Sequence, residues 1–76
     1  MKLIVVTPKK LIVDTEVKQV TLPGSDGEMT ILPNHTYLLS NLKRGTLRYP
    51  EGELKVSEGF VEVHENKVTV CVNSIS

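Results

Sequence analysis

Three side chains in this sequence are suited to metal or nucleophilic chemistry: His35, His64 and Cys71. Structural zinc sites pair their Cys and His ligands at spacings such as C-x2-C or H-x3-H, and no pair here has such a spacing. The residues around Cys71 supply neither a base nor the electropositive setting that activates a thiolate. We therefore expect no metal site, with His64 an exposed strand residue and Cys71 a small packed or half-exposed side chain.

Other catalytic patterns do not occur in the sequence. It contains no G-x-S-x-G nucleophile motif, and the Gly-rich residues 24–27 lack the Walker spacing. The carboxylates are spread singly along the chain, without a pair that spacing alone would place in acid–base geometry. We therefore expect a protein with no catalytic residues, no cofactor and no enzymatic activity of its own.

The residue totals exclude further classes of function. The chain has 76 residues, nine Lys and Arg against nine Asp and Glu, and one Cys. Zero net charge gives no electrostatic footprint for nucleic acid, and a single Cys cannot form an internal disulfide. The apolar run at residues 3–6 is too short for a signal peptide or a membrane span. We expect one soluble, intracellular domain over residues 1–76 that neither inserts into lipid nor binds nucleic acid.

The elements that must position any functional residue are expected to be β-strands. Val, Ile and Thr are frequent and Ala is absent, which favours pleated backbone over helix. Residues 53–57, 60–64 and 67–72 alternate apolar with polar side chains, as half-buried strands do. Hairpin turns are expected between them and before them, at residues 65–66 and 50–52.

The first half of the chain follows the same pattern. Residues 2–7 form a nearly continuous apolar run, typical of a strand covered on both faces. Strands are also expected at residues 16–22 and 28–32, and residues 37–42 are expected to be a short strand or a turn. The spacing of the turns predicts an all-β fold, a flattened antiparallel β-sandwich or barrel of about ten short strands. The aromatic side chains are expected to pack within it: Tyr37, Tyr49 and Phe60.

Two Pro-containing turns bracket the strand at residues 28–32. Gly24 and Gly27 are expected to form the first turn, and Pro33 and Asn34 the second. Loops held by a rigid sheet often carry binding function. From the residues alone, this segment is either an interaction site or an ordinary pair of turns.

The same segment resembles the N-terminal β-sandwich domain of the epsilon subunit of rotary ATP synthases. The pattern of that family reads approximately L-P-G-x-x-G-E-x-x-I-L-P-G-H-x-x-L-L, and residues 22–39 here read LPGSDGEMTILPNHTYLL. Further blocks agree with the family in order and spacing at residues 3–8, 43–48, 59–63 and 68–70. The resemblance therefore covers essentially the whole chain.

The resemblance implies a noncatalytic rotor subunit of the central stalk, which couples the gamma subunit to the membrane c-ring during ATP synthesis and proton transport. It implies a peripheral position on the cytoplasmic face of the bacterial inner membrane, or of an equivalent energy-transducing membrane. Glu28 matches the family's Glu that contacts the polar c-ring loops. Thr7 and His35 match positions that contact the gamma subunit.

The chain departs from the family pattern at several positions. Asn34 stands where Gly is usual, Thr36 and Tyr37 replace Ala-Pro, and Glu58 replaces a second Gly before Phe60. Asn is the residue after Gly that best tolerates positive φ, so we expect the turn to be kept. The helical hairpin that follows this domain in the family is absent from these 76 residues.

A hypothesis from another class of function stays open on the sequence alone. A free-standing β-barrel module could bind a peptide or an oligosaccharide along an edge strand. A small enzyme or a biotinyl carrier is the weakest hypothesis, because the Met-Lys hairpin motif of such carriers is missing.

Overall fold

The fold consists of nine strands arranged in two layers. The computed structural model describes residues 1–76. None of its elements is a helix that could serve as a transmembrane span. In chain order the strands are β1 (Lys2–Val6), β2 (Leu11–Glu16), β3 (Val20–Gly24), β4 (Gly27–Ile31), β5 (Leu38–Leu42), β6 (Gly45–Tyr49), β7 (Gly52–Val56), β8 (Gly59–His64) and β9 (Lys67–Val72).

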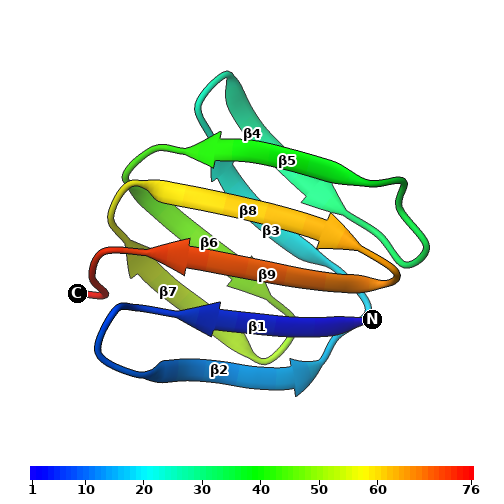
Figure 1. The fold of residues 1–76 in the computed structure, drawn as a ribbon, viewed down its shortest axis with the longest axis horizontal. Helices are drawn as coiled ribbons and strands as arrows, with labels where there is room; N and C mark the ends of the chain where they lie inside the picture. The colour runs from blue at the N-terminus through cyan, green and yellow to red at the C-terminus, as the bar shows by residue number, and fades with distance from the viewer.

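Hydrogen bonding joins these strands in the order β2-β1-β9-β8-β5-β3-β6-β7, and β4 pairs with β3. In space the path folds over into two layers, a front sheet β2-β1-β9-β8-β5 and a back sheet β4-β3-β6-β7 (Figure 1). The sheets are joined at one corner by the single register pair of Gly24 with Leu42. The expectation of a flattened all-β sandwich is confirmed, with extents of 28 × 25 × 20 Å.

One strand pair departs from the antiparallel expectation. β1 and β9 pair in parallel, from Lys2 beside Lys67 to Val6 beside Cys71, whereas every other pair is antiparallel. Parallel neighbours need a crossover connection, and here nearly the whole chain lies between them. This pairing brings the first strand and the last strand together in the centre of the front sheet (Figure 1).

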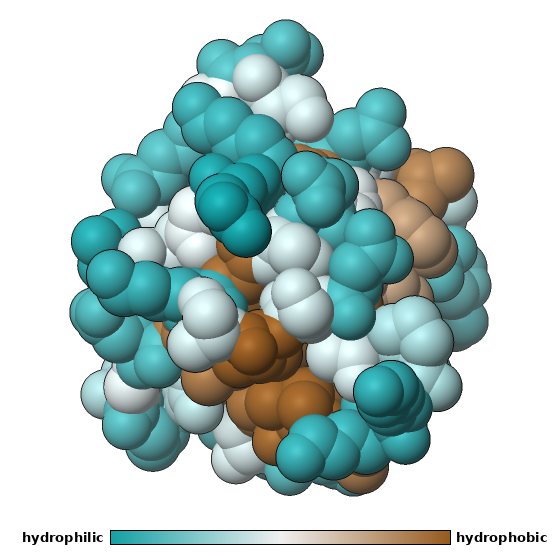
Figure 2. Space-filling model, turned by 90° about the vertical axis from the view of Figure 1, so that its left-hand side faces the viewer, coloured by the Kyte–Doolittle hydropathy of each residue, from teal (hydrophilic) through white to brown (hydrophobic).

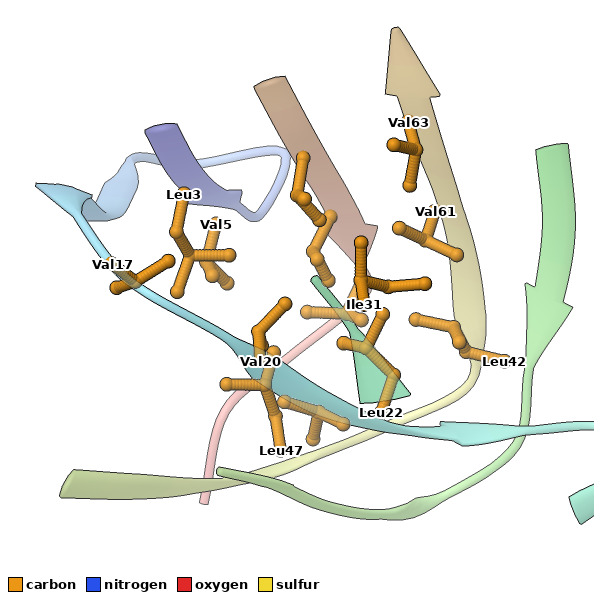
Figure 3. Close-up of a cluster of buried hydrophobic side chains, with 14 residues drawn as sticks. Leu3, Val5, Val17, Val20, Leu22, Ile31, Leu42, Leu47, Val61 and Val63 are labelled. Carbon is orange, nitrogen blue, oxygen red and sulfur yellow. The ribbon is translucent and has the colours of Figure 1, made fainter. Parts of the chain in front are cut away.

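The core lies between the two sheets and is built mainly from Val and Leu. On β9 the predicted alternation is confirmed, because Val68 and Val70 are fully buried while Lys67 is exposed. β1 was expected to be covered on both faces, but only Leu3 and Val5 are fully buried, since its other face is the outer face of the front sheet. Figure 3 shows the cluster, in which 14 hydrophobic side chains interdigitate between the sheets.

The strand expected over residues 16–22 is wrong, because the chain changes sheets within it. Glu16 ends β2, residues 17–19 cross over, and β3 starts at Val20. Val17 and Val20 both point into the core, which a single strand would not permit, because odd and even positions face opposite sides of a sheet. The Val17 N–H donates to the Met1 carbonyl oxygen at 2.7 Å and holds the crossover in place.

The turn expected around residues 23–27 is shorter than predicted. Gly24 is the last residue of β3 and pairs with Gly27, the first residue of β4, so the turn itself is Ser25 and Asp26. A Cβ on Gly24 would meet the Gly27 carbonyl oxygen at 2.7 Å, which explains why the strand ends need a glycine here. The expected turns at residues 33–34 and 65–66 are present.

Candidate interaction surfaces

Glu28 projects from the second position of β4, beside the tip of the β3–β4 hairpin. Its Oε2 accepts a hydrogen bond from Nη1 of Arg48 at 3.3 Å, and Nε of the same guanidinium lies 3.7 Å from Glu53 Oε1. All three side chains are more than half exposed. One guanidinium therefore holds two carboxylates on the outer face of the back sheet and leaves this cluster with one excess negative charge.

Thr7 begins the loop that connects β1 to β2. Its Oγ1 accepts hydrogen bonds from the N–H groups of Lys9 and Lys10, both at 3.3 Å, and lies 3.4 Å from the Lys10 carbonyl oxygen. The hydroxyl therefore orders its own loop. Thr7 also lines an apolar groove of about 330 Å³, together with Phe60 and Cys71.

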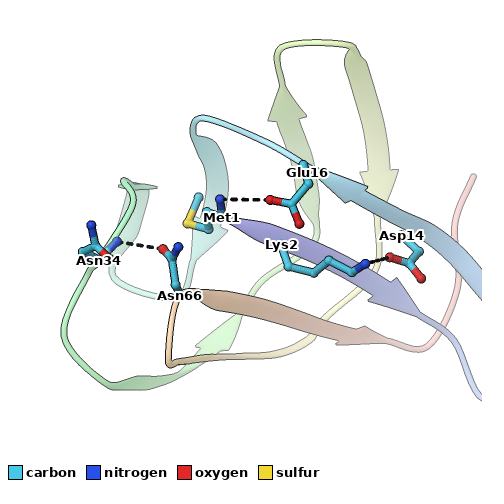
Figure 4. Close-up of polar contacts among 6 residues, drawn as sticks. All are labelled: Met1, Lys2, Asp14, Glu16, Asn34 and Asn66. Atoms are coloured by element: carbon cyan, nitrogen blue, oxygen red, sulfur yellow. Dashed lines mark hydrogen bonds and ion pairs between the residues drawn. The ribbon is translucent and has the colours of Figure 1, made fainter.

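His35 lies in the loop that joins β4 to β5. It is exposed, and its Nδ1 lies 2.8 Å from the Thr36 carbonyl oxygen. The preceding Asn34 adopts a φ of 64°, as expected, and its N–H donates to Asn66 Oδ1 at 2.9 Å. This bond, drawn in Figure 4, fastens the loop to the β8–β9 turn.

The structure does not bring Glu28, Thr7 and His35 together. The loop that carries Thr7 lies at the end of the front sheet toward which β1 runs, and the loop that carries His35 lies at the opposite end (Figure 1). Glu28 belongs to the back sheet, near the hairpin tip at the top of the same view. A partner that contacts both Thr7 and His35 must therefore extend along the front sheet.

The outer face of the front sheet, called the front face below, is partly apolar. Register places four side chains in one row across β2, β1, β9 and β8, called the front apolar row: Leu11, Val6, Cys71 and Phe60. Leu11 is 54% exposed and Phe60 is 46% exposed. Figure 2 views the end of the sandwich that carries the C-terminus. Its largest hydrophobic patch lies at the lower centre of this end, and a smaller group lies toward the right-hand edge, where the front sheet is.

The aromatic residues were expected to pack, and this expectation is wrong for Tyr37 and Phe60. Tyr37 is 59% exposed and directly precedes β5, where the centre of its ring lies 5.8 Å from that of His64 in an edge-on contact. Its hydroxyl donates to Glu62 Oε2 at 3.3 Å. The sequence did indicate the exposure of Phe60, because alternation along β8 places it on the face opposite Val61 and Val63.

No three metal-ligating side chains gather anywhere in the structure. His64 is exposed, as expected, and its Nε2 lies 3.0 Å from Glu65 Oε1. Cys71 is half-buried in the front apolar row and is not in a disulfide. His35 is in the β4–β5 loop, apart from Cys71 in the sheet.

Two ion pairs tie β2 to the start of β1 (Figure 4). The amino group of Met1 lies 3.3 Å from Glu16 Oε1, and Lys2 Nζ lies 2.8 Å from Asp14 Oδ1. The hydrogen bond to Asp14, and then the negative charge of that carboxylate, raise the pKa of Lys2 above its ordinary value of 10.5. These contacts close the edge of the front sheet at the end opposite Thr7.

A small β-sandwich that exposes an apolar row on one outer face is typical of a docking domain, which acts through surface contacts. The particular family follows from comparison with known proteins. Residues 1–76 match the family described as the beta-sandwich domain of the ATP synthase delta/epsilon chain, and this chain belongs to that family.

Individual relatives agree with this assignment. The chain is 42% identical over 78 residues to the ATP synthase epsilon chain of a Sulfurovum species, covering 96% of this chain and 61% of that protein. It is 46% identical over 75 residues to the ATP synthase epsilon chain of Desulfatibacillum aliphaticivorans, covering 92% of this chain and 53% of that protein. The chain thus spans little more than half the length of these relatives.

Solved structures show the same fold. A chain in the cryo-EM structure of the Euglena gracilis mitochondrial ATP synthase, with OSCP, F1 and c-ring, has a TM-score of 0.87 and 25% identity. That match covers 97% of this chain and 51% of the other. A chain of the Tetrahymena thermophila mitochondrial ATP synthase central stalk and c-ring has a TM-score of 0.87 at 19% identity, which shows the fold alone.

Proposed function

We propose that this chain is a noncatalytic subunit of the central stalk of an ATP synthase, which couples the gamma subunit to the membrane c-ring. Family membership supports the complex, and the epsilon-chain relatives support the subunit. The complex sits at the cytoplasmic face of the bacterial inner membrane or of an equivalent energy-transducing membrane. The domain would pass torque through packed interfaces, with no bond chemistry inside it.

The observation that carries this proposal is the exposed front apolar row. Apolar surface of this kind is stabilised when a partner removes it from water, at about 25 cal/mol per Å² buried. We propose that the gamma subunit covers the front face from Thr7, beside the apolar groove, along the sheet toward His35. An elongated partner can make both contacts at once.

The proposed c-ring contact is Glu28, which stands apart from the front face. Its carboxylate is exposed and shares Arg48 with Glu53, so the cluster keeps an excess negative charge that suits basic or amide groups on the c-ring loops. Because Glu28 and the front face belong to different sheets, the domain could hold the gamma subunit and the c-ring at the same time.

Co-purification with the gamma subunit of the same cell tests the first contact. We expect the wild-type chain to form a stable complex, and Phe60→Ser to weaken it by at least about tenfold, since Phe60 is the largest exposed side chain of the front apolar row. The matched control is Arg48→Gln on the back sheet, which should bind gamma normally. If the wild-type chain and gamma do not associate, the assignment fails.

Assembly of the whole complex tests the second contact. We expect Glu28→Arg to weaken attachment of the stalk to the c-ring, because it reverses the charge that faces the ring. Binding to gamma should not change and the thermal melt of the isolated chain should change only slightly, since Glu28 and Arg48 are both more than half exposed. If the stalk that carries Glu28→Arg attaches normally to the c-ring, Glu28 is not part of the c-ring interface.

A further inference from the structure

A polar pocket of about 340 Å³ lies on the back of the sandwich, between β6, β7 and the C-terminal segment. The three segments run side by side. Gly45 of β6 is paired with Val56 of β7, and Val56 forms a second bridge to Ile75 on its other side. Main-chain bonds from Ser57 N to the Ser74 carbonyl and from Ser76 N to the Lys55 carbonyl, at 3.1 and 3.0 Å, hold the C-terminal segment there.

This register places polar side chains in two rows on one face. Because alternate residues of a strand face the same side, the residues that flank the inward-pointing Val56 and its partners lie on the side away from the core, where Ser57 is only 7% exposed. The first row holds Thr46, Lys55 and Ser76, and the second row holds Arg44, Ser57 and Ser74. The pocket is therefore lined by two cations and four hydroxyls contributed by three separate segments.

The donors in this pocket have no partners inside the molecule. Neither Arg44 nor Lys55 takes part in any ion pair, and the hydroxyls of Thr46 and Ser74 make no hydrogen bond in the structure. Ser57 differs, because its Oγ accepts from the Ser74 N–H at 2.9 Å and so fixes the position of Ser74. The pocket thus holds two charged groups and two hydroxyls that no other group of the molecule uses.

The side-chain carboxylates nearest to Lys55 and Ser57 in sequence do not neutralise the pocket. One pairs with a different cation and the other lies outside the pocket. Glu53, two residues before Lys55, points to Arg48 at 3.7 Å. Glu58 is exposed in the β7–β8 connection and does not line the pocket, and only its carbonyl oxygen lies near Ser57 Oγ, at 3.3 Å. The side chains that line the pocket therefore carry an excess of positive charge, although the side chains of the whole chain carry none.

Two cations and several hydroxyls around one hollow match the donor set that phosphate oxygens accept, because guanidinium and ammonium groups make charge-assisted hydrogen bonds to them. We propose that this pocket binds a phosphate group, through Arg44 and Lys55 with the hydroxyls of Thr46 and Ser74. The site is on the opposite sheet from the front apolar row, so it does not depend on the proposed stalk function.

A titration of the whole chain with inorganic phosphate at constant ionic strength tests the proposal. The chain is prepared with an amidated C-terminus, so that no terminal carboxylate competes beside Ser76. Backbone amide signals of Gly45, Ser57 and Ser74 should shift in a saturable way, with a dissociation constant on the order of 1 mM. Chloride at the same ionic strength should not cause these shifts.

Two double variants decide whether the pocket or general charge is responsible. Arg44→Gln with Lys55→Gln should weaken phosphate binding by about tenfold, because it removes both charged donors. Lys9→Gln with Lys10→Gln removes the same charge from the neighbouring β1–β2 loop and should leave binding unchanged. Equal weakening in both double variants, or no saturable shift in the wild-type chain, would overturn the proposal.

The phosphate group could be free, part of a nucleotide, or part of a lipid headgroup. If ATP binds more tightly than inorganic phosphate, and the Arg44→Gln, Lys55→Gln double variant loses this binding, the ligand is a nucleotide. Co-sedimentation with phosphatidylglycerol vesicles, but not with phosphatidylcholine vesicles, assigns a lipid headgroup if it shows the same loss. If inorganic phosphate binds as tightly as ATP and as the lipid headgroup, the ligand is the free phosphate ion.

Discussion

The two outer faces of the sandwich share one core but differ in what they expose. The front face carries the front apolar row, with Phe60 and Leu11 about half exposed, and Leu39 and Tyr37 at its β5 edge. The outer face of the back sheet, called the back face below, carries polar side chains. On it, Thr21 and Thr30 share a hydrogen bond at 3.0 Å.

This difference separates the residues that hold the fold from those available for binding. Inward positions of both sheets are alike, because both sheets must fill the same core with Val, Leu and Ile. Outward positions are free to differ, since they contribute little to the packing of the core. The front face is suited to a partner with apolar surface, and the back face to charged or phosphate groups.

The largest expected effect comes from a glycine on the front sheet. A Cβ on Gly59 would collide with the Cys71 carbonyl oxygen and approach the Val72 Cα to 2.8 Å, and both are backbone atoms of β9. We expect Gly59→Ala to lower the free energy of unfolding by about 3 kcal/mol, the upper end of the range for overpacking. Chemical denaturation measures the change.

The matched control lies on the back sheet. Gly52 also begins a strand, but a Cβ there would meet only the Tyr49 hydroxyl, at 4.0 Å. We expect Gly52→Ala to leave stability unchanged or slightly higher, because Ala narrows the unfolded ensemble. If Gly59→Ala and Gly52→Ala lower the free energy of unfolding equally, the close approach of β8 to β9 does not explain the loss in Gly59→Ala.

A smaller loss is expected from truncating the shared core from either side. Val70 of the front sheet and Leu47 of the back sheet are both fully buried. We expect Val70→Ala and Leu47→Ala each to cost about 2 kcal/mol. Because one core serves both sheets, tyrosine fluorescence in versions that keep only Tyr37 (Tyr49→Phe) or only Tyr49 (Tyr37→Phe) should report the same unfolding transition. Two separate transitions would mean that the sheets unfold independently.

A still smaller effect is expected at the charged cluster of the back face. Arg48→Met removes both of its ion pairs, with Glu28 and Glu53, but these side chains are more than half exposed. We expect a loss of about 0.5 kcal/mol or less in the free energy of unfolding. The difference from wild type should vanish at about 1 M salt, where screening is strong. A difference that persists there would point to packing by the Arg48 stem.

The smallest effect is expected at high pH, at the front-sheet pair of Lys2 with Asp14. Because folding raises the pKa of Lys2, the contribution of the pair is complete below pH 10.5 and is lost as the pH rises through the raised pKa. The Lys2→Met variant should lack this alkaline decline, and Arg48→Met should keep it. Thermal melts at pH 8 to 11.5 compare the three proteins, and identical alkaline declines would exclude Lys2 as the source.

Most of the strand positions could be predicted from the sequence, because alternation is a local property. Residues 53–57, 60–64 and 67–72 correspond closely to β7, β8 and β9. The error over residues 16–22 arose where Val17 faces the core from a crossover, so that an apolar residue continued the pattern of a strand that had already ended.

The candidate sites were less predictable than the strands. Resemblance to a family selected Glu28, Thr7 and His35, but it did not show that they lie on three separate parts of the surface. Alternation with Val61 places Phe60 on the outer face of β8 and so predicts that it is exposed. An aromatic side chain is more often buried, and this led to the wrong expectation that Phe60 packs. The phosphate pocket had no sequence signal, since its donors come from residues 44–46, 55–57 and 74–76.

The sequence by itself determined that these residues form β-strands and, for β7, β8 and β9, which side of the strand faces the core, because side chains alternate along a strand whatever it pairs with. Only the tertiary structure decided the partners of the strands, above all the parallel pairing of β1 with β9. An apolar strand face can be buried against many others, so the choice depends on how the whole chain closes around one core. That closure also decided which outward residues became neighbours, and therefore where the front apolar row and the phosphate pocket lie.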